Sequence, residues 1–575
     1  MLAKELEDAA DKVENNFTFD EMIQQINSDQ ARVFEKIKNG VQLNDTKVKL
    51  YVSGEGGTGK SFLIKVIKRW IKGKINQETI VTAPTGIAAF NINGLTVHRV
   101  FQLPVEHGFT LRYTQLSDGA LKMLRDQLKD VVLIIIDEIS MISNITLLYI
   151  HLRLVEIFNV DEWFGGKHIV VFGDLLQLPP VHEDPTYKTL SSSDVEKFFG
   201  SLSCSNVWTN LFCYDELRIN MRQKADKAYA ELLSRVRIGA ITADDIKLLE
   251  QRKISFDSSL SYHNRLNEIC KYINKLPLDT VCLLPTCKQC DLINSVMLEK
   301  ISSKVTILNT HDHIDCSKFL EKKAFDSLSR MEDASRSAGL AKVIKIKIGA
   351  KVMLRRNIDV TLGLVNGAIG IVKSVSKSVE CNTIQSMNID LGTGKEYNIE
   401  KIKVKFQILD KAFVIRDQFP LCLSSAVTIY KSQGLSLNNA IINAGNTIFN
   451  VGQSYVAFSR VTKLEGLHLI NFDPHSIKAN SALIEEYNRS RKFYRSDLPA
   501  IPISGKRWSK VWDLIWGIED YSILNEREAI EKISCVDLLS INGIENSDGI
   551  SSGINSIMQC ILHNKKIRSS MQSVR

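Results

Sequence analysis

The sequence contains no apolar run approaching about 20 residues, the length needed to cross a membrane, so we expect no membrane-spanning segment. It also lacks an apolar stretch near its start, where MLAKELEDAADKVENN is strongly polar, and we therefore expect no secretory leader. Cysteine is sparse, with 11 in 575 residues, a usage typical of reduced thiols in an intracellular protein. No fixed-period repeat or low-complexity tract is visible, so the organisation must come from alternating strand and helix patterns.

Zinc ligands at the usual spacing are also missing. Cys287 and Cys290 form a CxxC pair, but no second tight pair of cysteine or histidine residues accompanies it. The stretch THDHID offers His311 and His313, yet an acid between two histidines is as typical of a solvated loop. We therefore expect ordinary thiols and a loop here, with a metal site as the minor alternative.

The chain also has only a small excess of positive over negative charge. The net charge is +8 with 24% charged residues, a mild basic excess that permits a nucleic-acid partner without establishing one. Hydrophobic residues make up 44% of the chain, and a chain of this length can bury several cores. We expect a large globular protein of two to four domains.

Short β-rich runs alternate with helical stretches in the first part of the chain, which predicts a parallel sheet with crossover helices. The predicted strands are Leu50–Ser53, Thr79–Thr82, Val131–Ile136 and His168–Phe172. Later α/β elements, at 280–286, 423–434 and 453–461, predict a second domain of the same kind. Between them lies a segment rich in Val, Ile and Gly turns, which predicts a small inserted β-barrel.

The segment GEGGTGKS, residues 54–61, matches the phosphate-binding pattern G-x-x-x-x-G-K-S between a predicted strand and an amphipathic helix. Its glycines let backbone N–H groups approach phosphates, while Lys60 is expected to reach the β- and γ-phosphates and Ser61 to ligate Mg²⁺. The alternative is a chance glycine-rich turn. The predicted nucleotide-binding residues of this loop are Gly54, Gly56, Gly57, Thr58, Gly59, Lys60 and Ser61.

A wholly apolar strand, VVLIII, ends in Asp137 and Glu138. Two adjacent carboxylates at the end of a buried strand are costly without a cation. Asp137 is therefore expected to hold Mg²⁺, and Glu138 to activate the attacking water. The alternative is a strand end with two solvated acids.

Another polar strand end occurs in VVFGDLLQLPP, residues 170–180. Alone, this stretch could be an exposed turn, because Asp, Gln and Pro are common loop residues. Beside the phosphate-binding loop it becomes a third strand that ends at the same sheet edge, where α/β proteins bind ligands. Asp174 and Gln177 are then expected to serve that site, and Gln177 to sense the γ-phosphate or its water.

Further motifs follow in a fixed order. They are INSDQ (26–30), APTGIAA (83–89), GLTVH (94–98), NMRQ (220–223), TIYKSQGLSL (428–437) and GQSYVAFSRV (452–461). With the three stretches above, they resemble the PIF-one DNA helicases of superfamily one, and most closely the helicase region of Helitron transposons. The resemblance covers roughly residues 22 to 470.

The resemblance implies an α/β fold of two RecA-like P-loop NTPase domains, with an inserted SH3-like β-barrel and a helical C-terminal tail. We predict the first RecA-like domain at 26–210, with a small wedge insertion at about 98–130, and the second at 211–340 and 413–480. The barrel is placed at 341–412. A lead-in occupies 1–25 and the tail 481–575.

The resemblance also assigns roles to single residues. It implies that Gln30 reads adenine, that Gly434 lies at the nucleotide, and that two arginines reach across the cleft between the domains to the γ-phosphate. These are Arg222 and Arg460, each of which would otherwise be expected in a surface salt bridge. The implied contacts to single-stranded DNA are Thr85, Thr96, His98, Thr428, Lys431 and Ser432.

The chain departs from the family pattern in several places. Tyr430 stands where the family usually has histidine, which puts a protonation role in doubt, and GDLLQ replaces the more frequent GDFxQ. The paired histidines of the nuclease that accompanies Helitron helicases are not convincing here. We therefore expect a helicase without that nuclease.

In the tail, Trp508, Trp512 and Trp516 recur at the helical spacing i, i+4, i+8. Packing onto the second domain is the expected role. A protein-docking or base-stacking face is the alternative, since basic residues flank the stripe.

These features together predict an ATP- and Mg²⁺-dependent DNA helicase that moves 5′ to 3′ on single-stranded DNA and unwinds duplex, in replication, repair, recombination or transposition. Its expected partners are single-stranded and partial duplex DNA, with no membrane, and the protein is expected to act as a monomer in the nucleus, with mitochondria as a further location. One alternative is a DNA-binding clamp or translocase that no longer unwinds, a domesticated remnant of a mobile element. Another is an ATPase that moves RNA.

Overall fold

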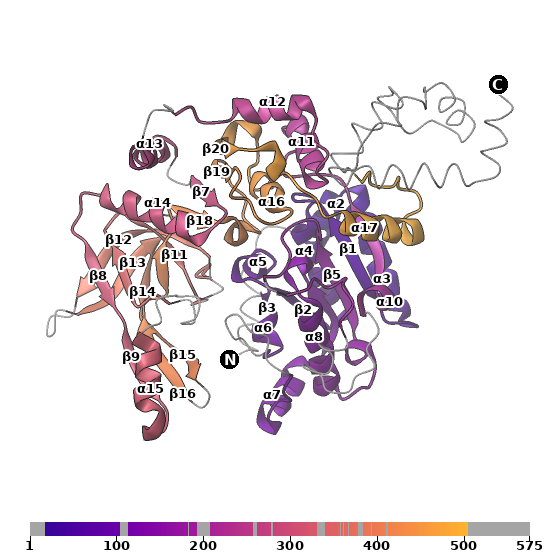
Figure 1. Cartoon of the computed structure of the whole chain (residues 1–575). Coiled ribbons are helices and arrows are strands. Elements are labelled where there is room, and N and C mark those ends of the chain that lie inside the picture. The colour runs from indigo at the N-terminus through magenta and orange to yellow at the C-terminus, as the bar shows by residue number, and fades with distance from the viewer. Residues whose placement is uncertain are drawn as a thin grey trace, which may run out of the picture. The chain divides into compact units, whose positions relative to one another are not determined.

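The computed structural model describes residues 18–103, 113–181, 183–191, 207–256, 261–277, 280–329 and 340–503, except for 357, 360, 361, 366, 378–382, 393, 410 and 411. Residues up to Pro502 form one compact unit, and every element described below belongs to it (Figure 1). The predicted tryptophan stripe and most of the predicted lead-in lie outside the described residues.

The first sheet has six parallel strands among the described residues, in the order β3-β2-β4-β5-β1-β6. The four predicted strands are confirmed to within one residue at each end. The unpredicted β6 pairs with β1, so the first sheet continues past residue 210, where the first domain is predicted to end. The strands are β1 (Lys49–Gly54), β2 (Glu78–Ala83), β3 (Leu95–Thr96), β4 (Val131–Ile136), β5 (His168–Gly173) and β6 (Cys213–Leu217).

Helices cover both faces of this sheet, and local capping fixes where several of them begin. Asn27 and Gln30 form a capping box at the start of α3, each side chain accepting from the backbone N–H of the other at 3.0 Å. The helices of this part are α2 (Phe19–Gln25), α3 (Ser28–Leu43), α4 (Lys60–Trp70), α5 (Gly86–Asn91), α6 (Val97–Val100), α7 (Asp118–Leu128), α8 (Asn144–Phe158) and α10 (Val207–Leu211).

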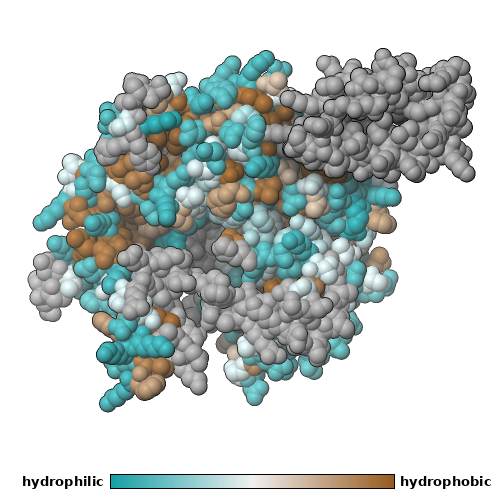
Figure 2. All heavy atoms as spheres, viewed as in Figure 1, coloured by the Kyte–Doolittle hydropathy of each residue, from teal (hydrophilic) through white to brown (hydrophobic). Residues whose placement is uncertain are grey.

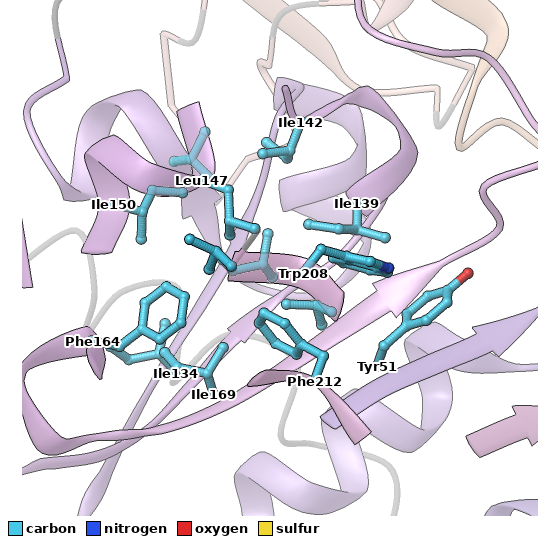
Figure 3. Packing of buried hydrophobic residues seen from close by; sticks show 14 of the residues in the cluster. Tyr51, Ile134, Ile139, Ile142, Leu147, Ile150, Phe164, Ile169, Trp208 and Phe212 are labelled. Carbon is cyan, nitrogen blue, oxygen red and sulfur yellow. The ribbon is translucent and has the colours of Figure 1, made fainter. Parts of the chain in front are cut away.

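Strands β4 and β5 are buried on both faces because nearly all of their residues are apolar. Along β4, Leu133 and Ile135 pack in the cluster that contains α3 and α4, whereas Ile134 and Ile136 pack in the cluster that contains α8. Figure 3 shows the second cluster, in which Trp208 lies near Ile139 and beside the aromatic rings of Tyr51 and Phe212. This double burial aligns the strand ends, and with them the polar residues that follow each strand.

The second parallel sheet has the strand order β18-β7-β19-β20, and it confirms the predicted second α/β domain. Its strands are β7 (Val281–Leu284), β18 (Ala426–Thr428), β19 (Ala440–Ala444) and β20 (Leu467–Phe472). The accompanying helices are α11 (Lys227–Arg237), α12 (Ala243–Gln251), α13 (Tyr262–Lys275), α14 (Cys287–Glu299) and α16 (Gln453–Ser459).

Antiparallel strands separate β7 from β18, as the composition predicts. They form sheets ordered β14-β13-β12-β11-β17, β15-β16-β9 and β10-β8, and helix α15 (Lys318–Ser329) contacts the second of these (Figure 1). The antiparallel region extends from 306 to 423 and so exceeds the predicted 341–412; its SH3-like character stays a prediction. The strands are β8 (Thr306–Asn309), β9 (His311–Asp315), β10 (Val343–Ile346), β11 (Lys351–Leu354), β12 (Ile369–Lys377), β13 (Ile384–Asp390), β14 (Glu396–Glu400), β15 (Ile402–Leu409), β16 (Ala412–Gln418) and β17 (Leu421–Leu423).

Helix α17 (Ser481–Tyr494) follows the second sheet in sequence but packs on the first. Leu483 and Tyr487 belong to the same apolar cluster as Ile134. Arg491 donates to both carboxylate oxygens of Glu216 on β6, at 2.6 and 2.8 Å. The predicted tail therefore begins with a helix that is part of the core of the first domain.

The surface seen in Figure 2 mixes hydrophilic and hydrophobic residues. Large exposed apolar side chains include Phe319 and Phe325 on α15. Of the helices described, none has both the length and the apolar character required to span a bilayer.

Candidate nucleotide site and nucleic-acid contacts

A pocket of about 690 Å³ collects most of the predicted nucleotide residues. It lies where the ends of β1 and β4 in the first sheet meet the segments after β18 and α16 in the second domain. Its volume is in the usual range of small-molecule sites. Its lining includes these predicted residues: Gly56, Gly57, Gly59, Lys60, Ser61, Asp137, Glu138, Gln177, Arg222, Gly434 and Arg460.

The loop between β1 and α4 needs glycine at two positions. Gly57 and Gly59 have φ of 96° and 79°, in the region that other residues rarely adopt. A Cβ at Gly57 would lie 2.6 Å from the Cβ of Arg222, and a Cβ at Gly59 would collide with the side-chain amide of Gln30. The predicted phosphate-binding loop is therefore packed tightly against its neighbours.

Lys60 begins α4, and its ammonium group turns back over the loop. Its Nζ donates to the carbonyls of Gly54 at 2.7 Å and Glu55 at 3.0 Å. Burial lowers its pKa, against the opposing effect of the Glu138 and Asp137 carboxylates. The ammonium therefore lies between the loop and the acids at the end of β4.

Asp137 and Glu138 are buried at the end of β4, as predicted. Burial and the neighbouring carboxylate raise the pKa of Asp137 to about 7. Glu138 has a φ of 51°, unusual for a residue with a side chain. Its Oε2 accepts from the Nε2 of Gln433 at 3.0 Å, a contact from the second domain that the motifs did not predict.

Asp174 and Gln177 have different surroundings in the structure. Gln177 lines the pocket, and its buried Oε1 has no hydrogen-bond partner. Asp174 is fully buried and binds Arg237 of α11, with Nε–Oδ2 and Nη2–Oδ1 distances of 2.9 and 2.8 Å. It also accepts from the hydroxyl of Tyr487 at 3.0 Å. Asp174 is therefore an interdomain contact and not part of the pocket lining, which corrects the expectation for this residue.

The two predicted arginines both line the pocket. Arg460 is 2% exposed, and its guanidinium donates to the carbonyl of Val456 at 2.9 Å and the hydroxyl of Ser459 at 2.9 Å. Arg222 donates to the carbonyl of Ser459 at 2.9 Å. Burial and the nearby Arg460 charge lower the pKa of Arg222 to about 10.

The resemblance implies that Arg222 reaches the pocket across the cleft, but its backbone lies on the side of the phosphate-binding loop. Its backbone N–H, like that of Met221, donates to the carbonyl of Gly57. The segment that carries Arg222 is therefore bound to the phosphate-binding loop itself, whereas Arg460 comes from the second domain.

Two further contacts join the phosphate-binding loop to the second domain. The N–H of Gly56 donates to the hydroxyl of Tyr455 on α16 at 3.0 Å, and the hydroxyl of Ser234 on α11 donates to the Glu55 carboxylate at 2.8 Å. Tyr455 lies inside the motif GQSYVAFSRV, and that motif is the signal in the sequence that marks it as a residue near the nucleotide site. No sequence signal marked Ser234.

Gln30, the predicted adenine reader, is 2% exposed and contacts the phosphate-binding loop. Its Nε2 lies 3.3 Å from the carbonyl oxygen of Thr58 and 3.2 Å from that of Gly59, and its Oε1 completes the capping box with Asn27. Both ends of the amide therefore bind protein groups. The adenine contact stays a prediction that requires these bonds to rearrange.

The predicted DNA contacts lie in both domains. Thr96 ends β3 and His98 lies in the first turn of α6, while Thr85 caps α5 by accepting from the N–H of Ala88 at 3.3 Å. Burial lowers the pKa of His98. These three residues are half-buried, so part of each side chain faces solvent.

In the second domain, Thr428 ends β18, and Lys431 is half-buried in the turn that follows. Ser432 is fully buried, and its hydroxyl donates to the carbonyl of Ile429 at 2.7 Å. That hydroxyl stabilises the turn, so the position of Ser432 does not favour the predicted phosphate contact. Tyr430 accepts from the amide of Asn450 at 2.6 Å.

The residues that suggested zinc do not form a metal site. Within the part of the chain that the structure describes, no three His, Cys, Asp or Glu side chains are placed to hold a metal ion. Cys287 is exposed and Cys290 buried on α14, and His311 and His313 lie on β9.

Two parallel-sheet domains and one pocket lined by a phosphate-binding loop, strand-end carboxylates and arginines define a P-loop NTPase with two RecA-like domains. Comparison with known proteins narrows this class. The PIF1-like helicase model matches residues 25–246, and the model for the 2B domain of DNA helicase Pif1 matches 337–375. Over these residues the chain is similar to the PIF1-like helicases, the family that its motifs resemble.

Curated relatives and solved structures agree with this placement. ATP-dependent DNA helicase PIF1 of Danio rerio is 26% identical over 82% of this chain and 64% of its own length, and the Homo sapiens protein is 27% identical over 81% and 64%. The chain thus spans less than two thirds of these relatives. The structure of Bacteroides Pif1 bound to single-stranded DNA superposes with a TM-score of 0.59 at 26% identity, covering 82% of this chain and 98% of that one.

Proposed function

We propose that this protein is an ATP-dependent DNA helicase that moves 5′ to 3′ along single-stranded DNA and unwinds duplex. The observation that supports this most strongly is the single pocket that brings Lys60, Glu138, Gln177 and the two arginines together from both domains. The relatives are named ATP-dependent DNA helicases, and a Bacteroides Pif1 structure holds ADP-AlF3 and single-stranded DNA.

In this proposal the loop 54–61 binds the phosphates through its backbone N–H groups, and Lys60 releases its carbonyl partners to bind the β- and γ-phosphates. Ser61 and Asp137 would hold Mg²⁺, since both line the pocket and both offer the oxygen ligands that this ion prefers. The ion would supply positive charge at the phosphates.

Glu138 takes the proton of the attacking water, and Gln177 holds that water or the γ-phosphate. Arg222 and Arg460 stabilise the charge that develops on the transferred group. Because Arg460 comes from the second domain, hydrolysis requires the two domains to be closed.

Thr85, Thr96, His98, Thr428 and Lys431 would grip the strand from the two domains in turn. Nucleotide binding would close the domains and hydrolysis would reopen them, so that the two grips advance alternately. Action as a monomer, a nuclear location and kinship with the Helitron branch belong to the same proposal, and they rest on the DNA substrate and the GDLLQ variant.

The decisive experiment is unwinding of a partial duplex that carries either a 5′ or a 3′ single-stranded tail, with ATP and Mg²⁺ and with Lys60→Ala as the inactive control. We expect displacement from the 5′-tailed substrate alone. Displacement from the 3′-tailed substrate would overturn the direction but not the motor. Hydrolysis without displacement would favour a translocase or clamp, and absence of both activities would favour a remnant that only binds DNA.

A further inference from the structure

Gln433 lies between residues that are predicted to bind DNA and a residue that lines the nucleotide pocket. It directly follows Lys431 and Ser432, in the segment predicted to bind DNA, and it precedes Gly434, which lines the nucleotide pocket. Its side chain is buried, with 2% exposed. Its Nε2 donates to Glu138 Oε2 at 3.0 Å and to the hydroxyl of Ser140 at 3.2 Å.

This contact joins the two domains. Glu138 follows β4 of the first sheet, whereas Gln433 follows β18 of the second sheet by way of the short turn Ile429–Ser432. The amide can therefore reach the carboxylate only while the domains are close together. Gln433 does not line the pocket, but Glu138, to which its amide donates, does.

The orientation of the amide follows from electrostatics. The reversed amide would place its carbonyl oxygen against the Glu138 carboxylate, and two acceptors repel. The observed orientation leaves the Oε1 of Gln433 buried without a hydrogen-bond partner, which carries a cost in free energy. The Nε2 of Gln433 thus donates to Glu138 while its Oε1 stays without a hydrogen-bond donor.

We propose that Gln433 is a positioning residue that orients Glu138 for water activation when the domains close on DNA. The inference rests on the proposed function and extends it to a residue with no assigned role. Donation to one carboxylate oxygen fixes the plane of the carboxyl group, and with it the direction from which that group can accept the proton of the water. DNA bound at the turn 428–432 thereby favours hydrolysis at the pocket.

Gln433→Met tests this, because methionine has a similar volume but no donor. With saturating single-stranded DNA we expect kcat for ATP hydrolysis to fall about tenfold, with the KM for ATP and the Kd for DNA unchanged within about twofold. Ser140→Ala, which removes only the other partner of the same amide, is the matched control and should retain the wild-type kcat.

Gln433→Asn provides a second variant, whose amide is one methylene too short to reach Glu138, and its thermal unfolding checks that the fold is kept. Wild-type kcat in both variants would overturn the proposal. An equal loss of kcat in Ser140→Ala, or weaker DNA binding with an unchanged kcat at saturating DNA, would also overturn it in favour of a packing role. If the wild-type protein shows no DNA-stimulated hydrolysis, the proposed function itself fails, a result distinct from failure of the Gln433 variants alone.

Discussion

Asp174 and Arg237 form a bidentate ion pair that joins the two domains with almost no exposure to solvent. Asp174 follows β5 of the first sheet, and Arg237 ends α11 of the second domain. The hydroxyl of Tyr487 donates to the same carboxylate at 3.0 Å. The guanidinium also lies 3.6 Å from the Glu55 carboxylate of the phosphate-binding loop. The Arg237 guanidinium therefore pairs with carboxylates of two segments that flank the nucleotide pocket.

Arg237→Met should destabilise the protein by about 3–5 kcal/mol, because it leaves the Asp174 carboxylate buried without its counter-charge. The double variant with Asp174→Leu should recover part of that loss, since it removes the uncompensated charge as well. Denaturant unfolding of the wild-type protein and the two variants measures this. Equal stability of the three proteins would contradict the assigned role of the pair.

The same pair predicts a dependence on pH. Burial alone would raise the pKa of Asp174, but the charge and hydrogen bonds of Arg237 outweigh it and hold the pKa below its ordinary value. A carboxyl group with a lowered pKa stabilises the fold above its unfolded pKa of about 3.9, and this stabilisation is lost as the pH falls through the folded pKa. The stability difference between wild type and Asp174→Asn should therefore be constant from pH 5 to 8 and shrink in stronger acid.

Lys60→Ala should reduce ATP hydrolysis by about 10²- to 10³-fold, because the developing charge on the phosphates loses its nearest ammonium group. Lys72→Ala, at an exposed position just after α4, is the control and should behave as wild type. Steady-state hydrolysis with and without DNA is the measurement. Full activity of Lys60→Ala would contradict the assignment of the loop.

Glu138→Gln should bind nucleotide normally and hydrolyse it about 10²- to 10⁴-fold more slowly, since the shape is kept and the base is lost. Filter binding of labelled ATP should show nucleotide retained on the protein. Failure to bind nucleotide at all would indicate that Glu138 is needed for the structure of the pocket and not for proton transfer.

Gln177→Ala should leave nucleotide and DNA binding intact but reduce DNA-stimulated turnover at least about tenfold. The buried Oε1 of Gln177 has no protein partner, so truncation removes no hydrogen bond made by that atom and should cost little stability. The ratio of hydrolysis with DNA to hydrolysis without DNA is the quantity to compare. A wild-type ratio would indicate that the segment GDLLQLPP is only a buried turn.

Lys431→Ala should weaken single-stranded DNA binding at low salt and reduce the slope of log K against log salt by about 0.7, the contribution of one phosphate contact. Ser432→Ala provides a contrast, because its hydroxyl is bound within the turn and should contribute no phosphate contact. Fluorescence anisotropy over a range of salt concentrations measures both. An unchanged slope for Lys431→Ala would remove this lysine from the DNA-binding surface.

The elements and residues that local patterns specify were predictable from the sequence. The strands that end at Gly54, Ile136 and Gly173 each have an apolar centre, and the polar residues after them meet at one sheet edge because parallel strands must align there. Lys60, Glu138 and Gln177 line one pocket for this reason.

Contacts between distant segments were not predictable in the same way. Asp174 and Arg237 are 63 residues apart, and no pattern in the sequence pairs them. A sequence also does not show whether a hydroxyl is exposed. The motif therefore predicts a DNA contact for Ser432, although its hydroxyl donates to a carbonyl within the turn. Strand β6 escaped prediction because CYDEL is short and partly charged, unlike the apolar strands beside it.

The return of α17 to the first sheet makes the second domain an insertion within the first. The chain leaves the first sheet after Leu217 and rejoins its core at Leu483, so the first domain contains both ends of the inserted part. Two covalent connections, near 218–226 and 473–480, join the halves. Two such points would define the axis of any hinge between the two domains. A single cut in either connection would leave the halves joined by the other.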